Sequence, residues 1–234
     1  MENLSGKKVL ITGGSSGIGK ATAEMLTSKG AIVCITGRNK SKLDSVASDL
    51  NAIPIYLDVS KYNQIAVKTL DAFHSMGGLD VLINNAGIGE FSKLEDIKLN
   101  QFENIFATNV FGLTMLTQEV VKFFKTQQHG TVINIGSSAS TKGFPSGSVY
   151  CASKFALRGL TECWRHELRR DNIRVILVNP SEVTTAFNNK KRIERDEEEK
   201  KLTPKEIAHA IVSAIKMDKR GFIPELNVWA TNPF

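Results

Sequence analysis

Short apolar runs rich in β-branched residues recur along the chain and constrain its fold more than any other feature of the sequence. Seven such runs occur, at KKVLIT, AIVCIT, AIPIYL, LDVLIN, GTVINI, IRVILV and GFIPELNVW, and stretches with helical patterning separate most of them. Hydrophobicity within the runs is continuous rather than alternating, as in strands that are buried on both faces. Because crossovers between parallel strands are right-handed, helices then cover both faces. The pattern predicts an α/β fold with a doubly wound parallel sheet of about seven strands, flanked by helices.

Length and composition limit how the chain is organised. A chain of 234 residues with 41% hydrophobic residues can bury one substantial core, and no low-complexity segment divides it, so we expect a single domain over residues 1–234. No apolar run approaches the roughly 18 to 20 residues that span a bilayer, and the start MENLSGKKVLITGG has no apolar signal segment followed by a cleavage site. We therefore expect a cytoplasmic protein with no membrane association.

The charged residues and the cysteines argue against other classes of partner. The formal net charge is +6, but lysines and arginines are interleaved with acids and form no dense block, so no nucleic-acid partner is expected. Binding of an anionic cofactor is enough to account for the excess of positive charge. Cys34, Cys151 and Cys163 lack metal-ligand spacing and are expected to be buried free thiols. Without a Cys/His cluster, no metal site is expected.

A glycine-rich turn, TGGSSGIG, follows the first apolar run and leads into the helical stretch KATAEMLTSKG. Such a turn lets backbone N–H groups and the positive end of a helix dipole approach a pyrophosphate. Three residues separate Gly13 from Gly17, and Gly19 closes the motif, so the spacing differs from the common G-x-G-x-x-G; on its own the segment could be a flexible loop. Its place at the first strand-to-helix turn of an alternating chain favours a dinucleotide site.

The second apolar run ends in CITGRN, where a dinucleotide-binding fold reads the ribose of its cofactor. Gly37 stands where an acid that holds the 2′-hydroxyl is expected, and Arg38 follows with a planar guanidinium suited to phosphate oxygens. We predict NADP(H) as the preferred cofactor, with NAD(H) as the alternative. The alternative interpretation of Arg38, as a solvated loop residue with no role in binding, stays open. Asp58, in LDVS, either accepts a bond from an adenine amino group or caps the following helix.

Six motifs together resemble the short-chain dehydrogenase/reductase family. They are TGGSSGIG at 12–19, NNAG at 84–87, ATNVFG around Asn109, NIGSS with Ser137, YCASK at 150–154 and NPSEVTT at 179–185, in the family's order over nearly the whole chain. The resemblance implies a Rossmann-type domain that uses NAD(H) or NADP(H) to interconvert carbonyls and alcohols. It implies Ser137, Tyr150 and Lys154 as the catalytic trio and Asn109 as a fourth, proton-relaying residue. The cofactor-binding residues that we expect are Gly13, Ser15, Ser16, Gly17, Ile18, Gly19, Arg38, Asp58, Val59, Asn85, Ala86, Gly87, Tyr150, Lys154, Pro180, Val183 and Thr185.

The pair Tyr150 and Lys154 also has a chemical rationale. Reduction of a ketone needs a proton for the developing alkoxide, and a phenol can supply it. The pKa of a free phenol is about 10, and a nearby ammonium lowers it. At i and i+4 on a helix the two side chains rise from the same face, although helix geometry alone fits a packing-plus-surface pair. Ser137 would hydrogen-bond the substrate oxygen, with Ser138 as the alternative.

Two departures from the family pattern bear on the loop after the sixth run and on the substrate. Ser181 stands where the family usually carries glycine, which puts the loop conformation in question because a non-glycine residue resists positive φ. The chain ends in ELNVWATNPF, unlike the reductases of fatty-acid synthesis. A small-molecule carbonyl or alcohol is therefore favoured as substrate. The alternatives are a 3-oxoacyl-thioester reductase and a non-catalytic NADP(H) redox-sensing module.

The resemblance also implies a substrate lid and an oligomer. The family places a mobile segment at about 186–202, where this chain is rich in charges of both signs, and a solvated helix is the alternative for the charged half. Apolar residues are frequent in the helical stretches from Leu99 to Thr126 and from Val149 to Arg170, and the corresponding helices pair between subunits in the family. We therefore predict a homodimer or homotetramer. Candidate walls of the substrate site are Phe144, Val149, Phe187 and the tip of INNAGIGEF.

Overall fold

All seven predicted strands are present in one parallel sheet. A computed structural model describes residues 2–187, 189 and 195–232 of the chain. Every strand begins inside one of the seven apolar runs, and the order across the sheet is β3-β2-β1-β4-β5-β6-β7. This topology confirms the doubly wound α/β fold. The strands are β1 Lys8–Ile11, β2 Ile32–Gly37, β3 Ile53–Tyr56, β4 Val81–Asn84, β5 Gly130–Ile135, β6 Ile173–Pro180 and β7 Glu225–Val228.

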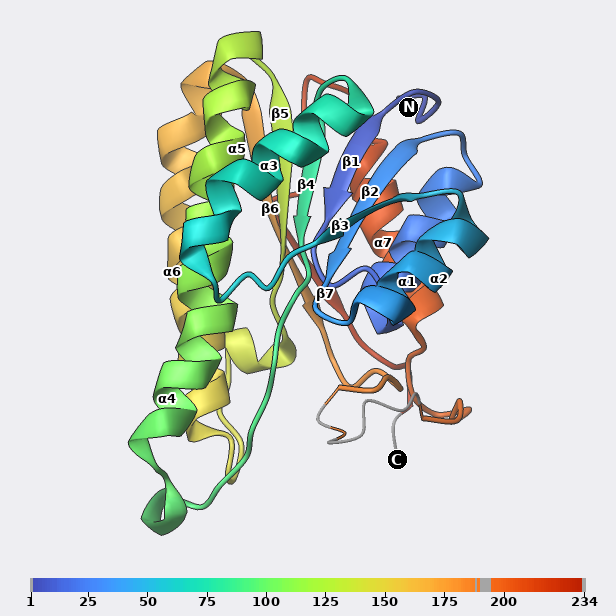
Figure 1. Cartoon of the computed structure of the whole chain (residues 1–234). Helices are drawn as coiled ribbons and strands as arrows, with labels where there is room; N and C mark the ends of the chain where they lie inside the picture. Colours follow the sequence, from blue (N-terminus) through green and yellow to red (C-terminus); the bar gives the residue numbers. More distant parts are fainter. Residues whose placement is uncertain (1, 188, 190–194, 233–234) are drawn as a thin grey trace.

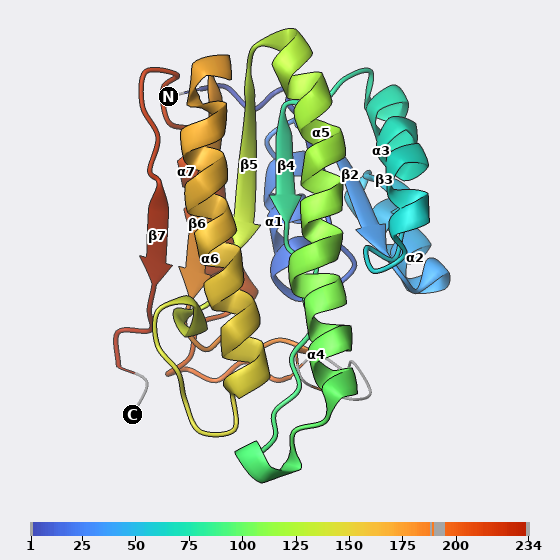
Figure 2. The same ribbon diagram turned by 90° about the vertical axis from the view of Figure 1, so that its left-hand side faces the viewer.

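Helices cover both faces of the sheet, as Figures 1 and 2 show from two sides. One face carries α1 Gly17–Thr27, α2 Lys40–Leu50 and α7 Pro204–Ile215, and the other carries α3 Tyr62–Met76, α5 Leu113–Gln127 and α6 Ser148–Leu168. The remaining helical pieces are α4 Leu99–Phe106, a π-helical turn at Ala107–Gly112, and 3₁₀ turns at Leu94–Asp96, Ser138–Ser140 and Arg169–Asp171. No helix in the described ranges is long and apolar enough to cross a membrane.

Two apolar layers, one on each face of the sheet, explain the continuous hydrophobicity of the strands. Successive residues of a strand point to opposite faces. In β1, Val9 and Ile11 pack into the layer beneath α1 and α7, whereas Leu10 packs into the layer beneath α3 and α5. Phe124 of α5 is fully buried in that second layer. Both faces of each central strand therefore need apolar side chains.

Buried amides fix α5 and α6 on the sheet. Asn84 of β4 and Asn134 of β5 are neighbours in register, and Asn84 Nδ2 donates to Asn134 Oδ1 over 2.9 Å. Asn84 Nδ2 also donates to Thr117 Oγ1 of α5 over 2.8 Å, and Asn134 Nδ2 donates to Thr161 Oγ1 of α6 over 2.8 Å. Since buried polar groups need partners, these bonds restrict α5 and α6 to one placement against the strands.

The long helical stretch predicted from Leu99 to Thr126 is divided in the structure. A π-helical turn at Ala107–Gly112 separates α4 from α5 and contains Asn109. Gly112 closes this turn against the connection from β3 to α3, where an added Cβ would lie 2.3 Å from the backbone oxygen of Val59. Single π turns inside helices occur frequently at functional sites, and this one lies beside the residues described next.

Candidate active site at the carboxyl edge of the sheet

The glycine turn after β1 adopts a backbone that side chains disfavour. Gly13 has φ +65° and Gly17 has φ +51°, both in the left-handed region. Ser16 precedes α1 with an extended backbone, and its side chain makes no capping hydrogen bond. The turn therefore presents the N-terminus of α1 at the carboxyl edge of the sheet, a geometry that fits an anionic pyrophosphate. Ile18 packs its side chain against the core, so only its backbone faces the turn.

The turns after β1 and β4 are hydrogen-bonded to each other. Asn85 Nδ2 donates to the backbone oxygens of Thr12 and Gly13 over 2.9 and 3.1 Å. In return, Thr12 Oγ1 accepts the backbone N–H groups of Asn85 and Ala86 over 3.0 and 2.9 Å. The predicted residues Gly13, Asn85 and Ala86 thus lie together. Thr12, which is not among the predicted site residues, connects them through its hydroxyl and its backbone oxygen. Its place directly before the glycines of the motif could have indicated this role.

The end of β2 lies against the same turn. An added Cβ on Gly37 would lie 3.1 Å from Ser15 Oγ, so the two predicted segments are adjacent. Arg38 is exposed and has no hydrogen bond or ion pair within the described part of the chain. A guanidinium in this position fits the additional phosphate of NADP(H).

Asp58 does not cap the following helix, so that alternative is wrong. Its Oδ1 accepts the backbone N–H and the hydroxyl of Ser60 over 3.0 and 2.8 Å, which closes a local turn. Helix α3 begins only at Tyr62, with Lys61 in the capping position. A short side chain that bonds two residues ahead favours such a turn over a cap. Val59 is buried in the apolar layer, so only its backbone can face a cofactor.

Lys154 lies on the same helix as Tyr150 and is enclosed by the sheet. Its Nζ donates to the backbone oxygen of Ile135, at the end of β5, over 2.8 Å. It lies 5.8 Å from the centroid of the Tyr150 ring. Burial lowers the pKa of Lys154 to about 8, because desolvation disfavours the charged ammonium.

Burial also controls Tyr150, in the direction opposite to the one expected. Desolvation raises the pKa of Tyr150 to about 12, the interaction with the Ser137 hydroxyl lowers it, and Cys151 raises it further. We predicted that Lys154 would lower the pKa of Tyr150. Within the protein this prediction is wrong, because desolvation of the phenolate is the largest effect on that pKa. Ser137 and not Ser138 is the serine that interacts with the phenol, as the motif spacing predicts.

Asn109 connects the π-helical turn to the loop after β4. Its Oδ1 accepts the backbone N–H of Ile88, and its Nδ2 donates to the backbone oxygen of Ile88, both over 2.9 Å. Nδ2 also donates to Ser153 Oγ on α6 over 3.1 Å. An added Cβ on Gly87 would lie 3.5 Å from Asn109 Oδ1 and 3.9 Å from Lys154 Nζ. The Asn109 side chain thus joins the π-helical turn to the loop after β4 and to α6.

Aromatic side chains surround the Tyr150 ring. Phe91, from the loop after β4, and Phe187, from the loop after β6, each lie 5.6 Å from the Tyr150 ring between centroids. Phe144 contacts Phe91 edge-on at 5.6 Å. Of the predicted wall residues, Phe187 and the tip of INNAGIGEF thus lie beside the Tyr150 ring, and Phe144 lies against Phe91. Val149 is buried within α6.

The loop after β6 returns to the glycine turn. Ser181 is not among the non-glycine residues with positive φ in the described ranges, so serine causes no backbone strain there. Its N–H donates to the backbone oxygen of Val228 over 2.8 Å. Thr185 Cγ2 lies 3.2 Å from the position of an added Cβ on Gly17. Pro180 is buried at the end of β6, and Val183 pairs with Leu202 in a single β-bridge.

The candidate lid at 186–202 lies only partly within the described residues, since 188 and 190–194 fall outside them. In the part that is described, Arg195 donates from Nε to the backbone oxygen of Thr185 over 3.0 Å and from Nη2 to that of Val183 over 3.2 Å. These bonds attach Arg195 to the loop after β6.

The cysteines differ from one another in environment. Cys34 and Cys151 are buried, as predicted, but Cys163 is exposed, because it lies on the outer side of α6. Burial raises the pKa of the Cys34 thiol to about 12, which makes it unreactive. No cluster of three or more metal-ligating side chains occurs among the residues that the structure describes.

Comparison with known proteins places this arrangement in a family. A model of the short chain dehydrogenases matches residues 7–196. An NADP-dependent 3-hydroxy acid dehydrogenase of Schizosaccharomyces pombe is 32% identical over 248 residues, covering 99% of this chain and 95% of the relative.

Solved structures agree in fold. An alcohol dehydrogenase from the archaeon Thermococcus sibiricus, complexed with 5-hydroxy-NADP, superposes with a TM-score of 0.89 at 27% identity, covering 96% of this chain and 97% of the other. A metagenomic short-chain oxidoreductase in complex with NADP gives a TM-score of 0.85 at 30% identity, with 98% and 99% coverage. The chain belongs to the short-chain dehydrogenase/reductase family of NAD(P)-dependent oxidoreductases.

Proposed function

We propose that the chain is an NADP(H)-dependent enzyme of the cytoplasm that interconverts a small-molecule carbonyl and a secondary alcohol. The observation that carries the proposal is the buried Tyr150 phenol beside Ser137 and Lys154, at the sheet edge that also holds the glycine turn. The exposed guanidinium of Arg38 supports the phosphorylated cofactor, and so do the NADP-linked names of the relatives.

The roles of the residues follow from their environment. When bound, NADP(H) supplies or accepts the hydride. Ser137 hydrogen-bonds the carbonyl oxygen of the substrate and stabilises its developing charge. With a pKa of about 12, Tyr150 is protonated near neutral pH, so its phenol holds the proton that reduction consumes. Lys154, which donates to the backbone oxygen of Ile135, holds its Nζ 5.8 Å from the centroid of the Tyr150 ring, where its role is to bind the cofactor ribose.

Apolar walls and the names of the relatives favour different substrates. The rings of Phe91, Phe144 and Phe187 beside the phenol support a carbonyl with an apolar substituent. The name of the S. pombe relative supports a 3-hydroxy acid. Turnover should therefore be measured with both classes and with a 3-oxoacyl thioester.

We further propose that the whole chain forms one domain and that the segment at about 186–202 covers the substrate.

The first prediction concerns the acid/base. Tyr150→Phe removes the exchangeable proton but keeps the ring, so NADPH-dependent turnover should fall by about 100-fold or more. NADPH affinity, measured by fluorescence titration, should stay within a few-fold. Most of the activity surviving in the variant would show that another group exchanges the proton.

The two neighbouring serines provide a matched control. Ser137→Ala should lower turnover by about 100-fold, because a hydrogen bond to the developing oxyanion is lost, whereas Ser138→Ala should keep most of it. Tight NADPH binding by the wild type without turnover on any substrate would favour the redox-sensing alternative.

The second prediction concerns Lys154 and pH. The folded protein releases this proton at about pH 8, whereas the unfolded chain holds it to its ordinary pKa of 10.5. Between pH 8 and 9 the unfolded state binds more protons at Lys154, so the free energy of unfolding rises with pH, by up to about 1 kcal/mol. Above pH 9 the raised pKa of Cys34, and above pH 10 that of Tyr150, acts in the opposite direction. Denaturant titrations between pH 8 and 9 should show the rise in wild type and in Tyr150→Phe.

Lys154→Met removes the titrating group and should flatten this rise. An equal rise in Lys154→Met would assign it to another residue.

The third prediction concerns the cofactor phosphate. Arg38→Asp replaces the phosphate-binding cation with an acid that suits a ribose hydroxyl, so the ratio of kcat/KM for NADPH over NADH should reverse. Lys40→Asp is the control, since it makes the same charge change two residues away, where Lys40 already pairs with Asp44. A reversal in both variants, or in neither, would mean that Arg38 does not read the phosphate.

The fourth prediction concerns a homodimer or homotetramer, which we propose to form through α4, α5 and α6. The outer sides of these helices, and of the π-helical turn between α4 and α5, expose several large apolar residues, namely Leu99 (73%), Phe102 (39%), Phe111 (50%), Met115 (38%) and Phe155 (47%). Phe111→Glu should shift the sedimentation coefficient toward that of a monomer. Leu70→Glu on α3, where the side chain is 44% exposed, should not. A monomeric wild type at micromolar concentration would refute the oligomer.

A further inference from the structure

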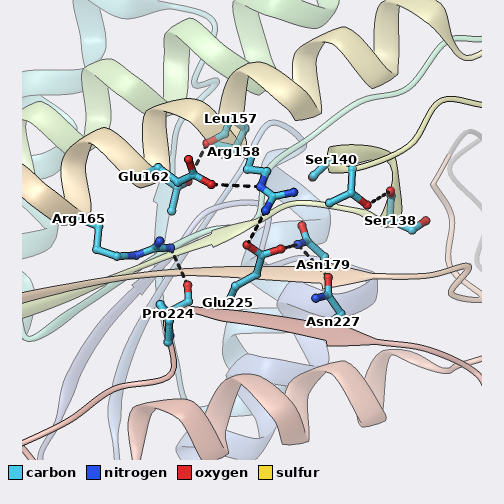
Figure 3. A network of polar contacts seen from close by, with 12 residues as sticks. Ser138, Ser140, Leu157, Arg158, Glu162, Arg165, Asn179, Pro224, Glu225 and Asn227 are labelled. Carbon is cyan, nitrogen blue, oxygen red and sulfur yellow. Dashed lines mark hydrogen bonds and ion pairs between the residues drawn. The ribbon is translucent and has the colours of Figure 1, made fainter.

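A hydrogen-bonded chain runs from the backbone of Ser137 to the last strand of the sheet. The N–H of Ser137 donates to Asn179 Oδ1 over 3.2 Å, and it also donates to Ser140 Oγ over 3.1 Å. Asn179 lies on β6 and is fully buried. Its Nδ2 donates to Glu225 Oε1 over 2.9 Å and to Asn227 Oδ1 over 3.1 Å, both on β7 (Figure 3). Every hydrogen-bonding group of the Asn179 amide is therefore used.

The fit around Asn179 leaves no room for a side chain at the preceding residue of the active-site loop. An added Cβ on Gly136 would lie 2.2 Å from Asn179 Oδ1 and 2.9 Å from Ser140 Oγ. The amide orientation is also determined, because its oxygen faces a donor and its nitrogen faces two acceptors. Asn179 thus contacts the backbone that carries Ser137 in a single arrangement.

The chain continues from β7 to the helix that carries Tyr150. Glu225 Oε2 lies 3.3 Å from Arg158 Nη2, and Arg158 Nε lies 3.2 Å from Glu162 Oε1 (Figure 3). Arg158 follows Lys154 by four residues and Tyr150 by eight, so the three share one side of α6. One carboxylate, Glu225, is therefore tied both to the backbone of Ser137, through Asn179, and to the helix of the acid/base.

We propose that Asn179 and Glu225 are positioning residues that hold Ser137 in register with Tyr150. The inference rests on the proposed function, in which Ser137 bonds the substrate oxygen. A carboxylate that accepts from Nδ2 polarises the amide and strengthens its oxygen as the acceptor for the Ser137 N–H. Because a displacement of about 1 Å at a reacting group can cost about 100-fold in rate, a loosened Ser137 lowers kcat.

A contact that merely holds β7 on the molecule provides the control. Arg165, on the same helix, donates from Nη2 to the backbone oxygen of Pro224 over 2.7 Å (Figure 3). Its Nε donates to the backbone oxygen of Val175 over 3.1 Å. Arg165→Met removes this attachment next to β7 and leaves Glu225 and Asn179 untouched. It separates the stability of the strand from the placement of Ser137.

The experiment compares Glu225→Ala, Glu225→Gln and Arg165→Met in the full chain. Glu225→Ala removes the acceptor, so kcat should fall by about 10-fold or more while KM for NADPH stays within about twofold. Glu225→Gln keeps an oxygen for Asn179 and should recover most of the loss. Arg165→Met should lower the melting temperature but keep kcat. Equal losses of kcat in Glu225→Ala and Arg165→Met at equal loss of stability would overturn the proposal.

Amide exchange of Ser137 tests the link without any reaction. Glu225→Ala should speed the exchange of this N–H by about 10-fold, and Arg165→Met should not. Unchanged exchange in Glu225→Ala overturns the proposal. If Glu225→Ala does not fold, Arg158→Met, which releases Glu225 at a partly exposed site, takes its place under the same criteria. A wild type without turnover refutes the proposed function alone, since the exchange rates still decide the link.

Discussion

Parallel pairing of strands that are buried on both faces is the constraint from which the rest of the structure follows. Parallel strands end at the same edge, and crossover helices begin there. The glycine turn after β1, the Asn85 loop after β4, the Ser137 segment after β5 and the Thr185 loop after β6 therefore meet without any contact in sequence. Apolar side chains on both faces fix the positions of the strand ends, and the loops that follow them bring polar groups together at this edge.

Burial gives the polar groups of this edge their chemical character. Lys154 loses part of its affinity for a proton and Tyr150 gains affinity, because the sheet and α6 exclude water from both. In water, both groups would keep their ordinary pKa values. In this buried site, the pKa of each depends on the charge that binds beside it. The surrounding hydrogen bonds, from Lys154 Nζ to the backbone oxygen of Ile135 and from the Ile88 N–H to Asn109 Oδ1, keep these groups in place while that charge changes.

The sequence predicts the strands, and which motif residues lie together at one edge of the sheet, far better than it predicts the energetics of those residues. Continuous apolar runs located all seven strands, because a strand that is buried on both faces appears in the sequence as an uninterrupted run of apolar residues. The turn at Asp58, the exposure of Cys163 and the raised pKa of Tyr150 could not be read, since each depends on which neighbours exclude water or offer a donor. The sequence shows Asn179 as a polar residue directly after the apolar run IRVILV. Its role could not be predicted, because its partners on β7 lie 46 and 48 residues further along the chain.

The position of β7 in the chain has a consequence for biosynthesis. During translation, the glycine turn, Ser137, Tyr150 and six strands emerge from the ribosome before Glu225 does. Until then, Asn179 has no acceptor for its buried Nδ2 and the edge of β6 is unpaired, which exposes backbone groups that attract other strands. The nascent chain therefore passes through a stage in which a nearly complete sheet remains open at one edge.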